Sequence, residues 1–297
     1  MQNFPKRNEE IARWIRECFI PRDGHHLIEI DYGQLEVRFA AIYHEDPVML
    51  NYLFDDTKDM HLDTACDLYV LEPDNVTKGI RHTAKNKFVF PEFYGSFYKT
   101  VADDLWNDIA IGGLKTKEGV PLDEHLIKKG LRHDDVDNAW LYHVSHCEDI
   151  FWKQRFRKYT KWKESWAELY MQRGYMQTKP GFVMQGNMSR NQIINYPVQS
   201  TAFHCLLKSL IRINRLIKRK KMRSMIVGQI HDSLVCDVHK NELDEFIAMC
   251  TQVMCDWIVE KWNWINNPLI AEVEKTELDQ PWSTIKKAHE YRTSIAI

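Results

Sequence analysis

The amino-acid sequence predicts an α+β fold. Two short apolar stretches, 27–32 and 226–238, have the character of buried strands, whereas long amphipathic stretches elsewhere predict helices. Strands and helices are segregated along the chain instead of alternating strictly, which favours α+β over a doubly wound parallel sheet. At 297 residues, with 44% hydrophobic residues, the chain can form one large domain or two modest ones.

The first half of the chain contains one predicted strand and several predicted helices. We expect a helix over 9–18, a turn at 21–24, and the strand that carries Asp31, which runs directly into a helix over 35–43. Residues 46–100 are mainly helical, with breaks at 73–75 and at Pro91. Residues 101–150 are polar and contain Gly and Pro, which predict an inserted, less regular segment.

The second half begins with an amphipathic helix over 149–173 and a hairpin-like connection over 174–182. A further helix over 199–221 precedes the hairpin that carries Asp232. A helix over 242–263 and a strand over 269–274 complete the pattern.

Composition indicates an ordinary water-soluble protein of the cytoplasm. No apolar run reaches the roughly 20 residues of a membrane helix, and no signal-peptide core follows Met1. The seven cysteines lack a CxxC pair and are expected to be reduced. Net charge is −2, and two basic runs, 153–163 and 212–223, are interpreted as solvated helix faces, with base stacking as the alternative for the first.

Asp31 and Asp232 each lie in an apolar strand-like stretch. A buried carboxylate is costly unless a cation compensates it. If the fold brings the two together, a pair of divalent ions about 4 Å apart is the natural compensation, and such a pair is used in phosphoryl transfer. The aspartate pair alone is compatible with nucleases, phosphatases and polymerases.

Short motifs around these aspartates narrow the choice. They are Asp31-Tyr32-Gly33-Gln34-Leu35-Glu36-Val37-Arg38; then Arg81, Lys85, Phe90, Tyr94 and Gly95; and then His231-Asp232-Ser233. They resemble motifs A, B and C of the family A DNA polymerases, relatives of bacterial DNA polymerase I. Three lesser matches, at 2–5, 59–61 and 195–202, stand in the family order. Six ordered motifs that span nearly the whole chain are far more specific than any one of them.

The resemblance implies an antiparallel palm sheet flanked by helices and a mainly helical fingers subdomain. The palm is expected to comprise 1–40 and 186–297, and the fingers 41–185 with an insertion near 101–150. Asp31 and Asp232 are the implied catalytic residues. With the main-chain carbonyl of Tyr32 they would hold two Mg²⁺ ions, for which Mn²⁺ is an alternative.

Deoxynucleoside triphosphate is the implied substrate. Arg81 and Lys85, four positions apart and hence on one side of a helix, would contact the triphosphate. The full set of implied nucleotide contacts is Gln34, Glu36, His61, Arg81, Lys85, Phe90 and Tyr94. Tyr94 follows Lys85 one position later than the family pattern has it, so either the helix carries a bulge or Phe88 replaces Phe90. Glu36 resembles the steric gate that excludes a ribose 2′-hydroxyl.

Primer-template DNA is the implied macromolecular partner. The implied contacts to DNA or to the primer end are Gln2, Asn3, Arg190, Asn195, Gln199 and His231. The family's thumb and 3′–5′ exonuclease are expected on a separate polypeptide, as in a split polymerase of the kind bacteriophages would encode.

The resulting prediction is a DNA-templated DNA polymerase catalytic subunit. One alternative is a single-subunit RNA polymerase or primase-like enzyme, which Ser233 favours slightly because His-Asp-Ser is usual there. The other is a non-catalytic polymerase-like assembly factor, against which the intact acids and cations argue.

Overall fold

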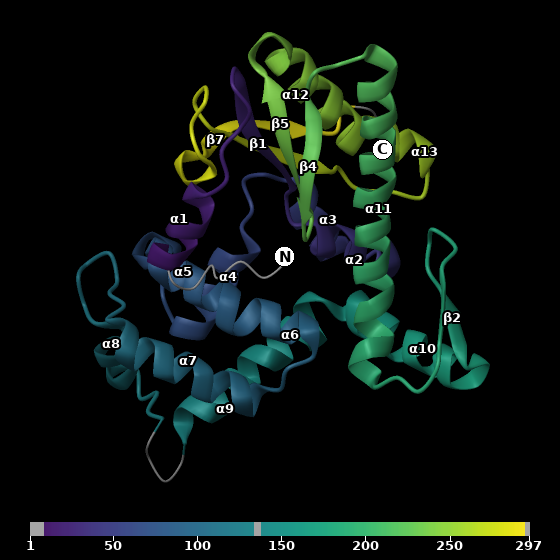
Figure 1. The fold of residues 1–297 in the computed structure, drawn as a ribbon. Helices are drawn as coiled ribbons and strands as arrows, with labels where there is room; N and C mark the ends of the chain where they lie inside the picture. Colours follow the sequence, from purple (N-terminus) through teal and green to yellow (C-terminus); the bar gives the residue numbers. More distant parts are fainter. Residues whose placement is uncertain (1–8, 134–137, 295–297) are drawn as a thin grey trace. The chain divides into compact units, whose positions relative to one another are not determined.

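The computed structural model describes residues 9–133 and 138–294, and the chain divides into two compact units (Figure 1). Unit 1 contains the described residues of 1–43, 173–186 and 196–297, and unit 2 contains those of 44–172 and 187–195. Gln2 and Asn3, two of the predicted DNA contacts, lie outside the described residues.

A five-stranded antiparallel sheet forms the centre of unit 1. Its strand order is β4 (Met225–Ile230), β5 (Ser233–His239), β1 (His25–Tyr32), β6 (Ile270–Lys275) and β7 (Lys286–Arg292). All neighbouring strands are antiparallel. The predicted α+β class is therefore confirmed. The sequence patterns did not reveal β7, because most of its residues are exposed and it lacks an apolar face.

Alternation along β1 separates an apolar face of the sheet from a polar face. Ile28, Ile30 and Tyr32 are at most 1% exposed, whereas Glu29 and Asp31 between them are partly exposed. Successive side chains of a strand point to opposite faces, so the three apolar residues share one face and the two acids share the other.

Two helical segments are bonded to β1 through its apolar face. They are α11 (Arg190–Lys220) and the run of α12 (Leu243–Gln252), a π turn (Val253–Trp257) and α13 (Ile258–Lys261). The buried Tyr32 hydroxyl donates to the Met254 carbonyl at 2.7 Å and lies 3.1 Å from Ser209 Oγ on α11. Tyr32 thereby fixes the end of β1 to both helical segments.

One end of the polar face is covered. Leu27, Val235 and Trp282 form a small apolar cluster there. Helix α1 (Glu9–Glu17) packs on the 3₁₀ turn that contains Trp282, with the Arg16 guanidinium 5.0 Å from the Trp282 ring centre. Asp31, toward the other end of this face, is partly exposed.

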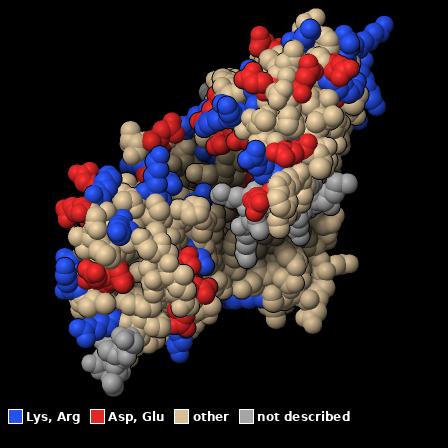
Figure 2. Space-filling model, turned by 60° about the vertical axis from the view of Figure 1, so that its left-hand side comes forward, with Lys and Arg blue, Asp and Glu red and all other residues tan. Residues whose placement is uncertain are grey.

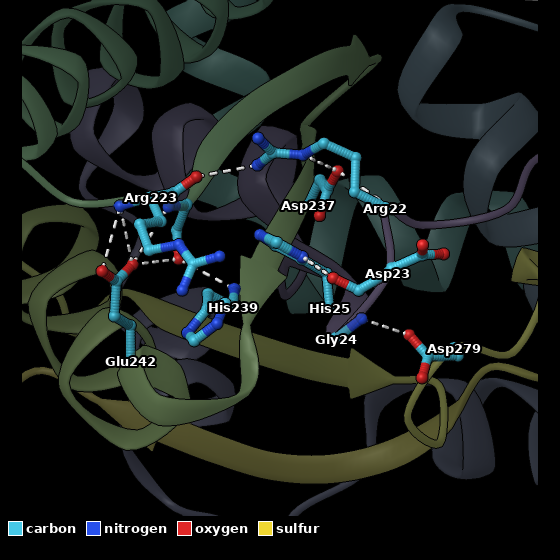
Figure 3. A network of polar contacts seen from close by, with 10 residues as sticks. Arg22, Asp23, Gly24, His25, Arg223, Asp237, His239, Glu242 and Asp279 are labelled. Atoms are coloured by element: carbon cyan, nitrogen blue, oxygen red, sulfur yellow. Dashed lines mark hydrogen bonds and ion pairs between the residues drawn. The ribbon is translucent and has the colours of Figure 1, made fainter.

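The end of the sheet opposite Asp31 is closed by a polar network (Figure 3). Arg22 Nε donates to the buried carboxylate of Asp237 at 2.8 Å, and Arg22 Nη2 donates to the Arg223 carbonyl at 2.7 Å. Glu242 in turn accepts from the main-chain N–H groups of Arg223 and Ser224. The network joins the segments that flank β1, β4 and β5, which supports the register of the three central strands.

Helix α11 begins at Arg190, nine residues before the predicted start at residue 199, and it contains Pro197 in its interior. Proline lacks the N–H that would bond the carbonyl four residues back, here Ile193 O. The Trp166 indole N–H donates to that carbonyl at 3.2 Å. A side chain thus replaces the missing helical hydrogen bond, and the helix continues through the proline.

Unit 2 consists mainly of helices around an aromatic core. The helices are α3 (Pro47–Phe54), α4 (Met60–Tyr69), α5 (Lys78–Ala84), α6 (Phe90–Tyr94), α7 (Tyr98–Gly112), α8 (Leu122–Lys128), α9 (Ala139–Asp149) and α10 (Arg157–Arg173). Phe151 lies at the centre of the core, with ring centres 5.5 Å from Phe88 and 4.8 Å from Phe156. All three rings are at most 1% exposed.

Two local predictions for unit 2 were wrong. The segment 101–150 is not irregular, since α7, α8 and α9 occupy most of it and the Trp140 indole donates to the Ala102 carbonyl at 2.9 Å. The helix predicted over 149–173 is not continuous. A π turn (Ile150–Arg155) precedes α10, and Phe156 between them leaves the helical conformation to enter the aromatic core.

The surface is charged with both signs. Lys and Arg side chains are interspersed with Asp and Glu over the face shown in Figure 2. All seven cysteines are free, and five of them are buried. Over 9–133 and 138–294, no helix has the length and hydropathy needed to span a bilayer.

Candidate functional site

The two aspartates singled out in the sequence meet at the accessible end of β1. Asp31 is paired with Ser233 across β1 and β5, and Asp232 immediately precedes β5 in the turn after β4. The Tyr32 N–H donates to the Asp232 carbonyl at 3.3 Å, which holds the turn against the strand. His231, the other residue of the turn, has a φ of 50°. The carboxyl groups of Asp31 and Asp232 lie within hydrogen-bond distance of each other.

Burial and neighbouring acids raise the pKa of Asp31. Burial contributes most, followed by the charge of Asp232, and the pKa rises from 3.8 to about 7. Glu29 and Glu272 contribute further repulsion. Glu272 is the partner of Asp31 across β1 and β6, so both side chains lie on the polar face. Several neighbouring carboxyl groups, one of them with a raised pKa, are typical of a site that binds a cation.

One oxygen of the pair has no partner among the described residues. Asp31 Oδ1 is buried, and no donor of the described residues lies within hydrogen-bond distance of it. Asp31 lines a hollow of about 570 Å³ together with Arg13, Arg16, Glu29 and Glu272. An unsatisfied buried acceptor next to a second carboxylate fits a hard divalent cation such as Mg²⁺.

The protein does not supply a complete cage for such an ion. Within the described ranges, no group of three or more His, Cys, Asp or Glu side chains is arranged to hold a metal. Mg²⁺ usually takes one or two carboxylates and fills its remaining positions with water and substrate phosphate oxygens. Asp31 and Asp232 therefore fit a substrate-completed Mg²⁺ site better than a structural metal site.

Ser233 is part of the scaffold of the carboxylate pair. It is 3% exposed, and its Oγ lies 3.0 Å from both Glu29 Oε1 and the Ile230 carbonyl. The Trp282 indole donates to the other oxygen of Glu29 at 3.2 Å. Glu29 is thus restrained from two sides and remains on the polar face beside Asp31.

The residues after Asp31 form the junction between β1 and α2 (Leu35–His44). Gly33 N–H donates to the Ile270 carbonyl at 2.9 Å, and Gln34 adopts a φ of 56°. Arg38, although part of the sequence motif, is 3% exposed and donates to the carbonyls of Gly33 and Pro268. Gln34 is exposed, and Glu36 is half-buried in the first turn of α2.

Unit 2 gathers four of the other predicted residues. The Lys85 ammonium lies 5.1 Å from the Phe90 ring centre, and His61 meets the same ring edge-on at 5.9 Å. Arg81 makes two hydrogen bonds to Asp59, the N-cap of α4, which is the helix that carries His61. Burial, followed by the charges of Lys85 and Arg81, lowers the pKa of His61 to about 4. His61 is therefore neutral at physiological pH.

A π turn over Lys85–Val89 accounts for the extra residue between Lys85 and Tyr94. A π turn accommodates one more residue than the α-helix and marks a one-residue insertion. Phe88 is 0% exposed and packs against Phe151, whereas Phe90 is partly exposed beside Lys85. The bulge, one of the two alternatives, is therefore what the structure contains. Pro91 falls in the first turn of α6, where a missing N–H is tolerated.

Two asparagines hold the end of α6. Asn195 Nδ2 donates to the Tyr94 carbonyl, and Asn191 Nδ2 donates to the Gly95 carbonyl, both at 3.3 Å. Gly95 has a φ of 87°, and a Cβ there would lie 2.4 Å from Asn191 Oδ1. Tyr94 itself is 46% exposed. Asn191 was not singled out from the sequence, since nothing in its local pattern shows that it faces Gly95.

The other predicted DNA contacts are distributed over both units. Arg190 is exposed at the first turn of α11 and lines a hollow with Glu164 and Glu168. Gln199 is half-buried in α11, and His231 is exposed in the turn before β5. The structure leaves the roles of these three residues as predictions.

Sequence reasoning also missed Glu92. This residue is 2% exposed and accepts a hydrogen bond from the Trp152 indole at 2.7 Å. Its buried Oε1 has no partner in the part of the chain that the structure describes. Burial raises the pKa of Glu92 to about 8. Lys163 lies 3.0 Å from the Trp152 ring centre, and burial lowers its pKa to about 8. A glutamate between Pro91 and two aromatic residues offers no pattern that predicts burial.

Comparison with known proteins agrees with this fold. A solved structure described as the POL domain of Pol1 from M. smegmatis, in complex with DNA primer-template and dNTP, has the same fold with a TM-score of 0.68. It is 21% identical and covers 96% of this chain and 44% of its own chain.

Curated relatives include DNA polymerase I of Chloroflexus aurantiacus, which is 26% identical over 86% of this chain, and the DNA polymerase of Bacillus phage SP01, which is 27% identical over 85%. The chain spans 24% and 26% of their respective lengths. The family model described as DNA polymerase family A matches residues 1–118 and 149–276. Because this match covers well over half of the sequence, the chain belongs to DNA polymerase family A.

Proposed function

We propose that this chain carries the catalytic centre of a DNA-templated DNA polymerase, which adds deoxynucleotides to a primer 3′ end. The contact between Asp31 and Asp232, with a buried oxygen left unpartnered, is the observation that carries the proposal. Family membership and the names of the relatives support it. A cytoplasmic location, in the bacterial host if a phage encodes the chain, is part of the same proposal.

Asp31 and Asp232 would hold two Mg²⁺ ions, or Mn²⁺ in their place, together with the carbonyl of Tyr32. When bound, the ions would stabilise charge on the attacking and leaving oxygens of the phosphoryl transfer. Tyr32 contributes rigidity, because its side chain is fixed in the core while its N–H holds the turn of Asp232. The protein thus presents both carboxylates before substrate binds, which reduces the reorganisation needed at reaction.

Unit 2 would bind the incoming nucleotide. Arg81 and Lys85 would neutralise the triphosphate, and the neutral His61 would donate one hydrogen bond to it. Phe90 and Tyr94 would pack against sugar and base. Gln34 and Glu36 are proposed as contacts to the sugar. Arg81 is held by Asp59 in two hydrogen bonds, which orient its guanidinium in advance.

DNA contacts are proposed for Arg190, Asn195, Gln199 and His231, together with Gln2 and Asn3. Amide side chains reach the acceptors that all base pairs present in the minor groove, so they can test pair geometry without reading sequence. Asn195 would do so indirectly, because its amide holds the Tyr94 carbonyl.

The palm is proposed to comprise 1–40 and 186–297, and the fingers 41–185. The family model leaves out 119–148, which supports an insertion within 101–150. We also propose a separate polypeptide with a thumb and a 3′–5′ exonuclease as a partner of this chain. Primer extension with and without proteins from neighbouring reading frames tests this, and long processive products from the chain alone would contradict it.

A second candidate is RNA synthesis, which Ser233 favours because the family's DNA enzymes often carry an acid there. Primer extension with Mg²⁺ and either deoxy- or ribonucleotides separates the two functions. We expect deoxynucleotide addition that is lost in Asp31→Asn and in Asp232→Asn. Activity retained by either variant would refute the metal assignment, and a preference for ribonucleotides would establish the second candidate.

A further inference from the structure

A groove on unit 1 is not used by the proposed reaction. It runs along α11 and has a volume of about 460 Å³. Its floor includes Leu207 and Ile211, which are four residues apart and so lie on one side of the helix. They are 36% and 42% exposed, high values for large aliphatic side chains. We call this hollow the α11 groove.

Two other segments of unit 1 also line the α11 groove. Trp257 belongs to the π turn before α13, and Trp262 follows α13. Pro180, in the connection between β2 (Tyr175–Gln177) and β3 (Val183–Gln185), lines it as well. The strand pair and α11 lie next to each other within unit 1, since the ring centres of Phe182 and His204 are 5.4 Å apart.

Three cations border this apolar floor. Lys208 Nζ lies 4.8 Å from the Trp262 ring centre, Arg212 Cζ lies 5.4 Å from that of Trp257, and Arg215 continues the row. The lining contains no acidic residue. Arg212 Nε is buried without an acceptor, and none of the three cations forms an ion pair within the described parts of the chain. The groove therefore has positive charge that the described chain does not neutralise.

Each of the two groove tryptophans already has a cation over its ring, so they are poorly suited to stack on nucleic-acid bases. Trp262 is already stacked on Trp264, with ring centres 4.9 Å apart, and Lys208 lies over it as well. Phosphates could neutralise the cations, but they would leave Leu207 and Ile211 exposed to water. A ligand that carries acidic and aliphatic side chains on one face satisfies both parts of the groove.

We infer that the α11 groove binds an acidic amphipathic segment of a partner polypeptide. From His204 to Arg215 the helix rises about 17 Å, which matches roughly 11 residues of a bound helix. The apolar side chains of the segment lie on Leu207 and Ile211, and its carboxylates lie beside Lys208, Arg212 and Arg215. Charge complementarity with the acid-free lining selects this class of partner.

The test is a fluorescence-polarisation titration of the whole chain at low salt. The probe is a labelled peptide of about 16 residues in which Leu at helical i, i+3, i+4 spacing alternates with Asp and Glu. We expect saturable binding in the micromolar range, weakened roughly tenfold or more in Lys208→Glu/Arg215→Glu and in Leu207→Ser/Ile211→Ser. The matched control is Lys218→Glu/Arg219→Glu, which changes the charge of the same helix equally beyond the groove and should bind like the parent.

Several results would overturn the inference. They are no saturation up to about 500 μM peptide, equal binding of the peptide with Asn and Gln in place of the acids, or equal loss in the control. Displacement of the peptide by oligo-dT at comparable affinity would assign the groove to single-stranded DNA. A dimer, detected by sedimentation, that the groove variants dissociate would assign it to a second copy. Lys208→Gln/Arg215→Gln, with its fold checked by circular dichroism, guards against misfolding of the charge-reversed variant.

Discussion

Asp31 and Glu272 are direct partners across β1 and β6, so their carboxylates lie side by side on the polar face of the sheet. Glu29 lies two residues before Asp31 on that face, and Asp232 reaches it from the neighbouring turn. Four acids in one region weaken the folded protein when no cation is present, and they also favour cation binding. Active sites commonly contain groups whose mutual repulsion lowers the stability of the fold but favours ligand binding.

Asp31→Asn should therefore stabilise the metal-free protein even though it removes activity. A carboxyl whose pKa is raised to about 7 in the folded state disfavours folding above that pH. Asn removes the penalty, so the free energy of unfolding should rise by roughly 1–2 kcal/mol near pH 8, and by less near pH 5, where Asp31 is protonated in the folded state. Urea unfolding in EDTA measures this. Asp104→Asn, at an exposed position, is the control and should change little.

Glu272→Gln should weaken divalent-cation binding without removing a proposed ligand. The loss of one neighbouring charge reduces the attraction for a cation, and a three- to tenfold rise in the Mn²⁺ dissociation constant is a rough expectation. Isothermal titration with Mn²⁺ measures it directly. Glu277→Gln, which removes an exposed charge just beyond β6, should leave the constant unchanged. An equal effect in both variants would show that only net charge matters.

Glu36→Ala should relax discrimination against ribonucleotides. If the half-buried Glu36 occupies the space of a 2′-hydroxyl, its truncation opens that space. Incorporation of ribonucleotides relative to deoxynucleotides should rise by roughly ten- to a hundredfold. The measurement is kcat/KM for both nucleotide types on one primer. An unchanged ratio would remove the gate assignment and leave the carboxylate pair unaffected.

Gly95→Ala should destabilise the protein more than the same change at another glycine with positive φ. The new Cβ would lie 2.4 Å from Asn191 Oδ1, and a φ of 87° is unfavourable for alanine. We expect a loss of about 2–3 kcal/mol, against roughly 1 kcal/mol for Gly113→Ala, where φ is 58° and no atom lies within 4 Å. Thermal unfolding compares the two. Combining Gly95→Ala with Asn191→Ala should recover the part of the loss that is due to the clash.

Glu92 should make stability depend on pH. An acid with a folded pKa near 8 and an ordinary unfolded pKa binds more protons in the folded state, so its contribution to stability falls as pH rises from about 4.5 to 8. In Glu92→Gln, which keeps an acceptor for Trp152, the loss of unfolding free energy between about pH 5.5 and 7.5 should be smaller. Glu124→Gln, at an exposed site, should behave like the parent. An identical pH dependence in Glu92→Gln would contradict the assignment.

The sequence predicted most of the sheet, since β1, β4–β5 and β6 are short apolar segments between turn residues. It could not show that Asp31 faces Glu272, because cross-strand register depends on pairing between distant segments. The early start of α11 was missed because its Pro197 normally marks a helix end, and only the distant Trp166 makes the proline tolerable. Glu92 and Asn191 were missed for the same reason, since their partners lie elsewhere in the chain.

Resemblance, more than periodicity, connected Asp31 with Asp232. The residues around each aspartate do not indicate that two acids some 200 residues apart lie together in the fold. The prediction that they do relied on the order of the motifs. The structure brings this pair together within unit 1 and gathers His61, Lys85 and Phe90 within unit 2. The roles of these residues in catalysis remain for the measurements above.

The π turn at Lys85–Val89 allows related chains to differ by one residue in the spacing between the lysine and the tyrosine. One residue added to a regular helix rotates everything after it by about 100° relative to what precedes it. Here the added residue is absorbed within five positions, and the Tyr94-Gly95 end is still held by Asn195 and Asn191. Chains with either number of residues between the lysine and the tyrosine can therefore have the same arrangement of helices. A search that requires a fixed interval between the lysine and the tyrosine would pass over the longer form.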